Sequence, residues 1–479
     1  MTESQSPKTT PEGRLEAHLS VHFDFYKDQM QALRDIIAAT APYASALDEP
    51  TAKFAEFFSI IPQIPAPRLP EIRELISRLG TGGLSFRQFA KEVLENYNRE
   101  RWSLALIAKF HESVTRQPRL PMLRNALLTA AVGSLEASIA TVVTEFYHCR
   151  PEALEMNSKD RDKEFSLKDL AQFSTVQDAI DSSISKRVES LMFGGLGDWR
   201  KFFVDAMKID LATLAVNWPA LQEVFQRRHV IVHNGGRASR RYIAQMKSLD
   251  PGESITEGAV LDCSQEYLEY AIDQLLVAGV LLISAVIVKF SSNSIVTAYL
   301  NPLAYSLLRE GRWETVKRLC QYGMEMSVDQ DSILIFKVNM ALAIKAMDGL
   351  DGIADEISSW DVSALSDRFK LAKACLMGDL DEAFRLLTLL TDRDELSTED
   401  LVEWPLLSEV RNDRRFTAII SPRLAGPDGL KLLGPEFVIL NPRSGTVHKQ
   451  DCRFAKSGEL VSSEAPEVQA ARHCKECWK

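Results

Sequence analysis

The segment Leu123–Tyr147 reads LRNALLTAAVGSLEASIATVVTEFY. Its apolar side chains recur every three or four residues, which is the spacing of one face of an α-helix, and such a face has to be buried against other elements. We therefore predict a long core helix that begins near Pro121. The apolar positions on this face are Leu123, Leu127, Leu128, Ala131, Leu135, Ile139, Val142 and Val143.

The same period runs through roughly the first 400 residues, whereas alternation with a period of two is scarce, so we expect a mainly α protein. With 46% hydrophobic and 25% charged residues the composition is that of a globular chain, which excludes collagen-like, low-complexity and wholly disordered classes. The expected helices are Arg14–Ala39, Thr51–Ile61, Ser85–His111, Phe203–Leu214, Trp218–His233 and Gln265–Phe290.

The most apolar stretch, Leu275–Val288 (LLVAGVLLISAVIV), is 14 residues long. A helix that spans a bilayer needs about 20 apolar residues, so we expect a buried bundle helix and no association with a membrane. The N-terminal residues Met1–Arg14 are polar and do not resemble a signal peptide. Four of the seven cysteines are scattered singly, as in proteins of the reducing cytosol, and three cluster near the C-terminal end. These features predict a cytoplasmic protein.

Changes in pattern divide the chain into four units. Residues 1–118 form a helical region without a chemical signature, and residues 119–295 form a helical bundle. Residues 296–425 read as short helices in pairs, and their glycine spacings of 38 and 29 residues lie around the 34 of tetratricopeptide repeats. This part resembles divergent tetratricopeptide repeats, and a plain helical bundle is the alternative. The glycines that separate the helices of each pair are Gly311, Gly349 and Gly378.

The fourth unit, residues 434–479, changes character. It begins with GPEFVILN, which is rich in strand-forming residues, and a turn follows at Pro442–Gly445. We expect a small zinc-binding module with some β structure.

This unit carries a metal-ligand pattern. His448 and Cys452 form H-x3-C, and Cys474 and Cys477 form C-x2-C 21 residues later. Two close pairs of ligands joined by a loop match the tetrahedral coordination of Zn2+, and four protein ligands leave no position for a substrate, so the zinc would be structural. His473 is the alternative to His448, although it adjoins Cys474. The unit also resembles the small metal-binding module of Ada-like and nuclease-associated proteins.

A local excess of positive charge contrasts with the net charge of −10 of the chain. Val224–Leu249 contains five arginines and one lysine and neither Asp nor Glu, which is the charge pattern that suits a phosphate backbone. We therefore expect this segment to bind RNA. The residues expected to contact RNA are Arg227, Asn234, Arg237, Arg240 and Arg241.

At its centre, RRHVIVHNGG contains Arg228 and His233 in an R-x4-H spacing, followed by Asn and Gly residues that end a helix. A histidine can move protons near neutral pH and an arginine can hold phosphoryl oxygens, so the pair can cleave RNA without a metal ion. Residues five apart on a helix differ by roughly 140° in direction. Two copies packed about a twofold axis would bring both residues into one cleft, so the chemistry predicts at least a homodimer. Arg443 and His448 share the spacing, but zinc binding explains His448 better.

Leu123–Tyr147, the RRHVIVHNGG segment and the long helix after ESITEGAVLDCSQEYLEYAIDQLL together resemble the HEPN superfamily, most closely its RiboL-PSP-HEPN type. The resemblance covers residues 121–290. It implies a helical, dimerising, metal-independent endoribonuclease with the motif Arg, a polar residue, three variable residues, His. Arg228, His229 and His233 match this motif and are the catalytic residues that it implies. His229 stands where the family often has Asn, which leaves open which histidine is the base.

Two other interpretations of these histidines remain. His229 and His233 stand at i and i+4 and could bind a metal, although no carboxylate or cysteine is near them in the sequence. His233 could also be an ordinary helix-end histidine, stabilised by the helix dipole.

The combined prediction is an endoribonuclease that cleaves RNA through attack by the 2′-hydroxyl, as a toxin or phage-defence effector whose repeats bind a protein trigger or antitoxin. The alternative is a non-catalytic scaffold, in which the bundle only dimerises and the repeats bind a peptide. The acid-free basic segment beside R-x4-H favours the enzyme, because a scaffold would not need it.

Overall fold

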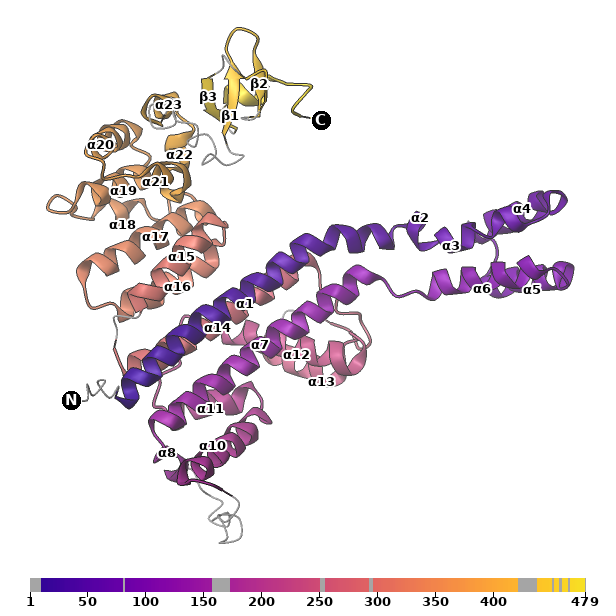
Figure 1. Cartoon of the computed structure of the whole chain (residues 1–479), viewed down its shortest axis with the longest axis horizontal. Coiled ribbons are helices and arrows are strands. Elements are labelled where there is room, and N and C mark those ends of the chain that lie inside the picture. The colour runs from indigo at the N-terminus through magenta and orange to yellow at the C-terminus, as the bar shows by residue number, and fades with distance from the viewer. Residues whose placement is uncertain are drawn as a thin grey trace, which may run out of the picture.

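The computed structural model describes residues 10–80, 82–156, 173–249, 255–292, 296–420, 437–449, 452–455, 459–463 and 466–478. The chain is mainly helical and has a small four-stranded sheet near its C-terminal end, which confirms the predicted fold class (Figure 1). The helix predicted at Gln265–Phe290 has those bounds, and the one predicted at Trp218–His233 ends one residue later. The helix predicted at Phe203–Leu214 is wrong, because the preceding helix ends at Asp205 and Lys208 adopts a positive φ of 57°.

Three long helices that pack along one another form the centre of the molecule (Figure 1). They are α1 (Pro11–Asp48), α7 (Arg119–Cys149) and α14 (Gln265–Phe290). Helices α1 and α14 approach closely at Gly279, where a Cβ atom would lie 2.1 Å from the ring of Tyr26. The Tyr26 hydroxyl donates to the carbonyl of Leu275 over 2.7 Å. The first helix of the predicted region 1–118 therefore shares a core with the predicted bundle.

Helix α14 is buried along most of its length, as its apolar composition predicts. Every residue from Gln274 to Ile287 is buried. Arg101–Cys149 and Gln265–Phe290 are each long and apolar enough to cross a bilayer. The second segment meets this criterion because α14 extends beyond the 14-residue apolar run Leu275–Val288. A core helix has the same length and composition, and 89% of the most apolar window of α14 is buried within the protein.

Among the described residues between α7 and α14 there are five shorter helices. Helix α10 packs on α7, α12 packs on both long helices, and α13 packs on α12. Helix α12 begins where the Asn217 side chain accepts the N–H of Ala220 over 3.2 Å, and it ends at Gly235, which has the left-handed φ of 58° that favours glycine. These helices are α8 (Ala153–Met156), α10 (Val176–Met192), α11 (Leu196–Asp205), α12 (Trp218–Asn234) and α13 (Arg240–Leu249).

The remainder of the first predicted region has a core of its own. Phe57, Ile72, Phe89 and Leu106 are buried together, and these helices lie beyond the end of α1 and the start of α7 (Figure 1). The elements are α2 (Pro50–Lys53), α3 (Ala55–Phe58), η1 (Ile61–Gln63), η2 (Ala66–Arg68), α4 (Leu69–Gly80), α5 (Phe86–Tyr97) and α6 (Arg101–Thr115).

The segment after the bundle consists of short helices. Gly311 separates α15 from α16, Gly349 separates α17 from α18, and Gly378 separates α19 from α20. The first of these helices share the core of the bundle, and those after α17 have their own. The elements are η3 (Val296–Leu300), α15 (Asn301–Arg309), α16 (Trp313–Met326), α17 (Gln330–Asp348), α18 (Ala354–Ser358), α19 (Asp367–Met377), α20 (Leu380–Asp392), α21 (Thr398–Glu403), η4 (Pro405–Leu407), α22 (Ser408–Arg411) and α23 (Arg414–Ile420).

The C-terminal module is a sheet in the order β3-β1-β2-β4. Strand β1 is antiparallel to β2 and β3, and β4 is parallel to β2. The expected turn at Pro442–Gly445 joins β1 to β2, and the strand predicted at GPEFVILN is confirmed for its described residues. The predicted domain boundary between 425 and 434 lies outside the described residues. The elements are β1 (Phe437–Asn441), β2 (Thr446–His448), β3 (Glu459–Ser462), α24 (Pro466–Gln469) and β4 (Arg472–His473).

Candidate functional site

The predicted catalytic histidines lie on the last two turns of α12. His229 and His233 are both exposed, and their ring centroids are 4.5 Å apart at an interplanar angle of 48°. Partial burial, followed by the proximity of His233, Arg241 and Arg228, lowers the pKa of the His229 imidazole. A neutral imidazole near pH 7 can accept a proton. This end of α12 therefore presents a proton acceptor to solvent.

Arg228 faces a different neighbour. Its Nη2 atom lies 3.7 Å from Oε2 of Glu136 on α7, and both side chains are 30% exposed. Its Nε atom is buried and makes no hydrogen bond within the part of the chain that the structure describes. The guanidinium is thus held against α7, while the two histidines point to solvent.

The fold brings acidic residues to the segment that lacks them in the sequence. Arg227 donates from Nε to Glu223 over 2.7 Å and from Nη1 to the carbonyl of Asp262 over 2.8 Å. Arg240 pairs with Glu257 over 2.8 Å. Together with the pair between Arg228 and Glu136, these contacts correct the expectation of an acid-free surface, because a window of sequence does not include acids from other elements.

The other expected RNA-contacting residues are exposed. Arg237 donates to the carbonyl of Gly258 over 3.2 Å, and the carbonyl of Asn234 accepts the N–H of Arg237. Within the described residues, Arg241 makes no ion pair, and it is close enough to His229 to affect its pKa. Arg241 and His229 therefore belong to the same surface, whereas Arg227 faces inward with a side chain only 15% exposed.

Glu223 is a residue of this site that the motif does not include. Its carboxylate accepts hydrogen bonds from the hydroxyls of Tyr242 on α13 and Tyr267 on α14, over 2.9 and 2.6 Å, besides the bond from Arg227. Burial, together with the Glu223 carboxylate, raises the pKa of both tyrosines, which stay protonated donors. This network ties α12 to α13 and α14. The i, i+4 spacing of Glu223 and Arg227 was a sequence signal for one of its contacts.

The predicted metal ligands come together in the C-terminal module. The ligand atoms of the set lie within 4.8 Å of one another, and this is the only group of three or more His, Cys, Asp or Glu ligands among the described residues. The set consists of His448, Cys452, Cys474 and Cys477. The cluster could hold a metal ion.

The distances fit a tetrahedral ion. Nδ1 of His448 lies 3.3 Å from Sγ of Cys452, which lies 4.0 Å from Sγ of Cys474. Zn–S bonds of about 2.3 Å place two sulfurs about 3.8 Å apart in a tetrahedron. The alternative ligand His473 is wrong: it lies in β4, outside the cluster, with its ring stacked on Trp478. The pair His229 and His233 is likewise not part of a group of three ligands in the described residues.

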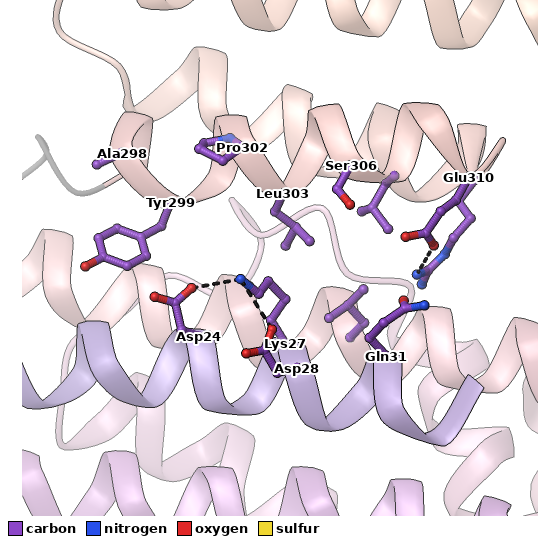
Figure 2. A pocket seen from close by; sticks show the side chains of 13 residues that line it. Asp24, Lys27, Asp28, Gln31, Ala298, Tyr299, Pro302, Leu303, Ser306 and Glu310 are labelled. Carbon is purple, nitrogen blue, oxygen red and sulfur yellow. Dashed lines mark hydrogen bonds and ion pairs between the residues drawn. The ribbon is translucent and has the colours of Figure 1, made fainter. Parts of the chain in front are cut away.

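A cavity of about 320 Å³ lies between α1 and the segment η3–α15, away from α12. Figure 2 shows Asp24, Lys27 and Gln31 of α1 facing Tyr299 and Leu303 across it. Lys27 is 2.9 Å from Asp24, so charges within the wall pair with each other. No residue of the predicted catalytic set lines this cavity.

A larger groove of about 580 Å³ lies on the helices that follow the bundle. It is lined by α15, α17 and α19 and by Asp400 and Trp404. On its wall the Asn339 amide donates to the Asn301 side chain over 3.1 Å. The groove thus crosses three helices that belong to three predicted pairs.

Comparison of the chain with protein-family models, curated proteins and solved structures finds no match.

Proposed function

We propose that the chain is a cytoplasmic, metal-independent endoribonuclease of the HEPN type, acting as a toxin or phage-defence effector. The observation that carries the proposal is the exposed histidine pair at the end of α12, with the charge of Arg241 close to His229. Histidines that exchange protons and arginines that hold a phosphate are the groups that RNA cleavage requires.

The reaction follows from these groups. The ribose 2′-oxygen attacks the adjacent phosphorus, and one histidine accepts the proton of the 2′-hydroxyl. The bond from phosphorus to the 5′-oxygen breaks, and the departing oxygen takes up a proton from water. Arg228 stabilises the negative charge on the phosphorane oxygens. The products are a 2′,3′-cyclic phosphate and a 5′-hydroxyl, and DNA, which has no 2′-hydroxyl, is not cut.

A homodimer completes the site in this proposal. Arg228 is turned toward α7 while the histidines face solvent, so one chain does not offer both to one phosphate. Val232 lies between the histidines in the sequence and is 49% exposed, and Val260 is 64% exposed. A second copy would bury such side chains and place its own Arg228 opposite His233.

The decisive experiment is cleavage of total RNA by the purified full-length protein in the presence of EDTA. His233→Ala and Arg228→Ala should each lower the rate by about 10² to 10⁴-fold, the usual contribution of a general base or an equivalent group. His229→Ala should have a smaller effect if that residue only orients the phosphate. His111→Ala, which removes another exposed helix histidine, is the matched control and should leave the rate unchanged.

Two results would overturn the mechanism. One is cleavage by His233→Ala at the wild-type rate. The other is loss of cleavage in EDTA while the C-terminal module still holds its metal. In cells, expression of the wild-type chain should arrest growth, and His233→Ala should not.

For the C-terminal cluster we propose structural Zn2+. Three thiolates and one imidazole are a common zinc set and leave no open position for a substrate. The valine core of the module, Val438, Val447 and Val468, is small, so the ion would supply much of its stability.

A second candidate function is the non-catalytic scaffold. The groove across α15, α17 and α19 favours it, because a groove of about 580 Å³ can take several residues of an extended peptide. The same groove could receive a protein trigger or antitoxin of the enzyme. Absence of cleavage in the EDTA experiment, with the dimer intact, would favour the scaffold.

A further inference from the structure

The C-terminal module exposes two large aromatic side chains beside its metal cluster. Phe454 is 51% exposed and Trp478 is 39% exposed. Phe454 lies two residues after Cys452, and Trp478 directly follows Cys477. Neither ring belongs to the valine core of the module. Because the module leaves about half of each of these large side chains in water, the exposed ring surface points to a ligand.

Positive side chains accompany both rings. The Arg453 guanidinium is 4.7 Å from the centroid of Phe454, and Nζ of Lys449 is 5.6 Å from that of Trp478. His473 lies flat against Trp478, with centroids 4.2 Å apart and an interplanar angle of 10°. Residues 437–479 contain seven Lys or Arg against five Asp or Glu, in a chain whose net charge is −10.

The metal cluster holds these side chains close together. The N–H of Lys449 donates to Sγ of Cys477 over 3.3 Å, so the segment that carries Lys449 lies against the one that carries Trp478. Arg453 lies 3.5 Å from Glu476, two residues before Trp478. A bound ion would fix both segments in this arrangement.

We propose that this surface binds single-stranded RNA. Unpaired bases would stack on Phe454 and on the pair formed by His473 and Trp478, because every base offers a π face to an aromatic ring. Phosphates would lie against the exposed cations around them. These cations are Lys449, Arg453, Arg472 and Lys475.

The inference rests on the proposed function, since it assigns to the module the task of holding the RNA that α12 cleaves. A peptide would also accept aromatic contacts. The surplus of positive charge beside flat, paired rings favours a polyanion with stacking groups.

The test is fluorescence anisotropy with a fluorescein-labelled ten-nucleotide uridine RNA and the full chain carrying His233→Ala, which under the proposed mechanism cleaves RNA at least about 100-fold more slowly. Adding Phe454→Leu and Trp478→Leu keeps apolar bulk but removes both rings. The Kd should rise about tenfold or more, which corresponds to about 1.4 kcal/mol. Trp478→Phe keeps a ring and should retain most of the affinity. Phe193→Leu is the matched control, because Phe193 is an 86% exposed aromatic residue on another part of the chain.

Zinc content is measured for each variant, so that loss of the module is not mistaken for loss of stacking. An RNA duplex of the same length should bind more weakly, because its base faces are covered. Wild-type affinity in the double Leu variant with its zinc intact would overturn the inference, and so would equal loss of duplex binding in that variant.

Failure here can be told apart from failure of the proposed function. Anisotropy reports binding and not cleavage, so a protein without ribonuclease activity can still show the predicted loss. Conversely, a wild-type protein that cleaves RNA while Phe454 and Trp478 are dispensable for binding would refute only the inference about this module.

Discussion

Replacing Glu223 by Gln should loosen the part of the bundle that positions the end of α12. The Glu223 carboxylate accepts hydrogen bonds from Arg227, Tyr242 and Tyr267 over 2.7, 2.9 and 2.6 Å. The side chains of Glu223 and Arg227 are only 20% and 15% exposed. The substitution keeps the shape but removes the charge that all three donors face.

The magnitude follows from these contacts. Hydrogen bonds to a charged group contribute about 1.5 to 3 kcal/mol each, and removing one partner of a buried ion pair costs about 3 to 5 kcal/mol. Because Gln retains one acceptor oxygen and the site is partly exposed, we expect the free energy of local opening to fall by about 3 kcal/mol, at the lower end of the range for buried pairs. That corresponds to about a 100-fold increase in the equilibrium constant for local opening.

Hydrogen exchange is the appropriate assay, because a chain with several cores does not unfold in a single step. Exchange should accelerate about 100-fold in α13 and in residues 255–263, while the amides of α14 keep their protection. Tyr242→Phe removes one hydrogen bond to the charged carboxylate, which contributes about 1.5 kcal/mol at the weaker end of the range for such bonds, and should give about a tenfold effect. The rate of RNA cleavage should fall more in Glu223→Gln than in Tyr242→Phe.

Glu257→Gln is the matched control. Glu257 pairs with Arg240 on the surface, where the two side chains are 56% and 88% exposed, and exposed pairs contribute little. Exchange in Glu223→Gln within twofold of the wild type would refute the role assigned to the network.

Three further predictions concern the metal, the pH dependence and the dimer. Cys474→Ser should release the ion and abolish exchange protection in strands β1 to β4 without affecting α1 or α14. Stoichiometric zinc in the Cys452→Ser, Cys474→Ser and Cys477→Ser variants would rule the site out. Arg241→Gln removes a positive charge that disfavours protonation of His229, so the pKa of His229 should rise toward 6.5, as NMR of labelled histidines would show; an unchanged pKa contradicts their proximity. Val232→Asp should give an inactive monomer by light scattering, and an active monomer would contradict the composite site.

The sequence was informative where the determining pattern is local. The bounds of α14 and the end of α12 at Gly235 follow from helical periodicity and capping. The ligands His448, Cys452, Cys474 and Cys477 were predictable because each pair is close in sequence and the chemistry of the ion specifies the rest. The place of α1 was not predictable, because the contact of Tyr26 with Gly279 joins residues that no sequence window contains.

The charge of the candidate site was likewise not predictable from a window of sequence, because acidic residues reach it from other elements. A window without Asp or Glu suggested a bare basic surface, yet α7 supplies Glu136, Glu223 precedes the window by one residue, and the segment after α13 supplies Glu257. Glu223 and Glu136 pair with the partly buried Arg227 and Arg228, so these two arginines serve the fold, and Glu257 offsets the charge of the exposed Arg240. Under the proposed function, the attraction of α12 for RNA depends on cations that are exposed and make no ion pair within the described residues, Arg241 above all. Few exposed cations at α12 are then free to bind a long RNA. This is the physical reason to propose a second RNA-binding surface on the C-terminal module.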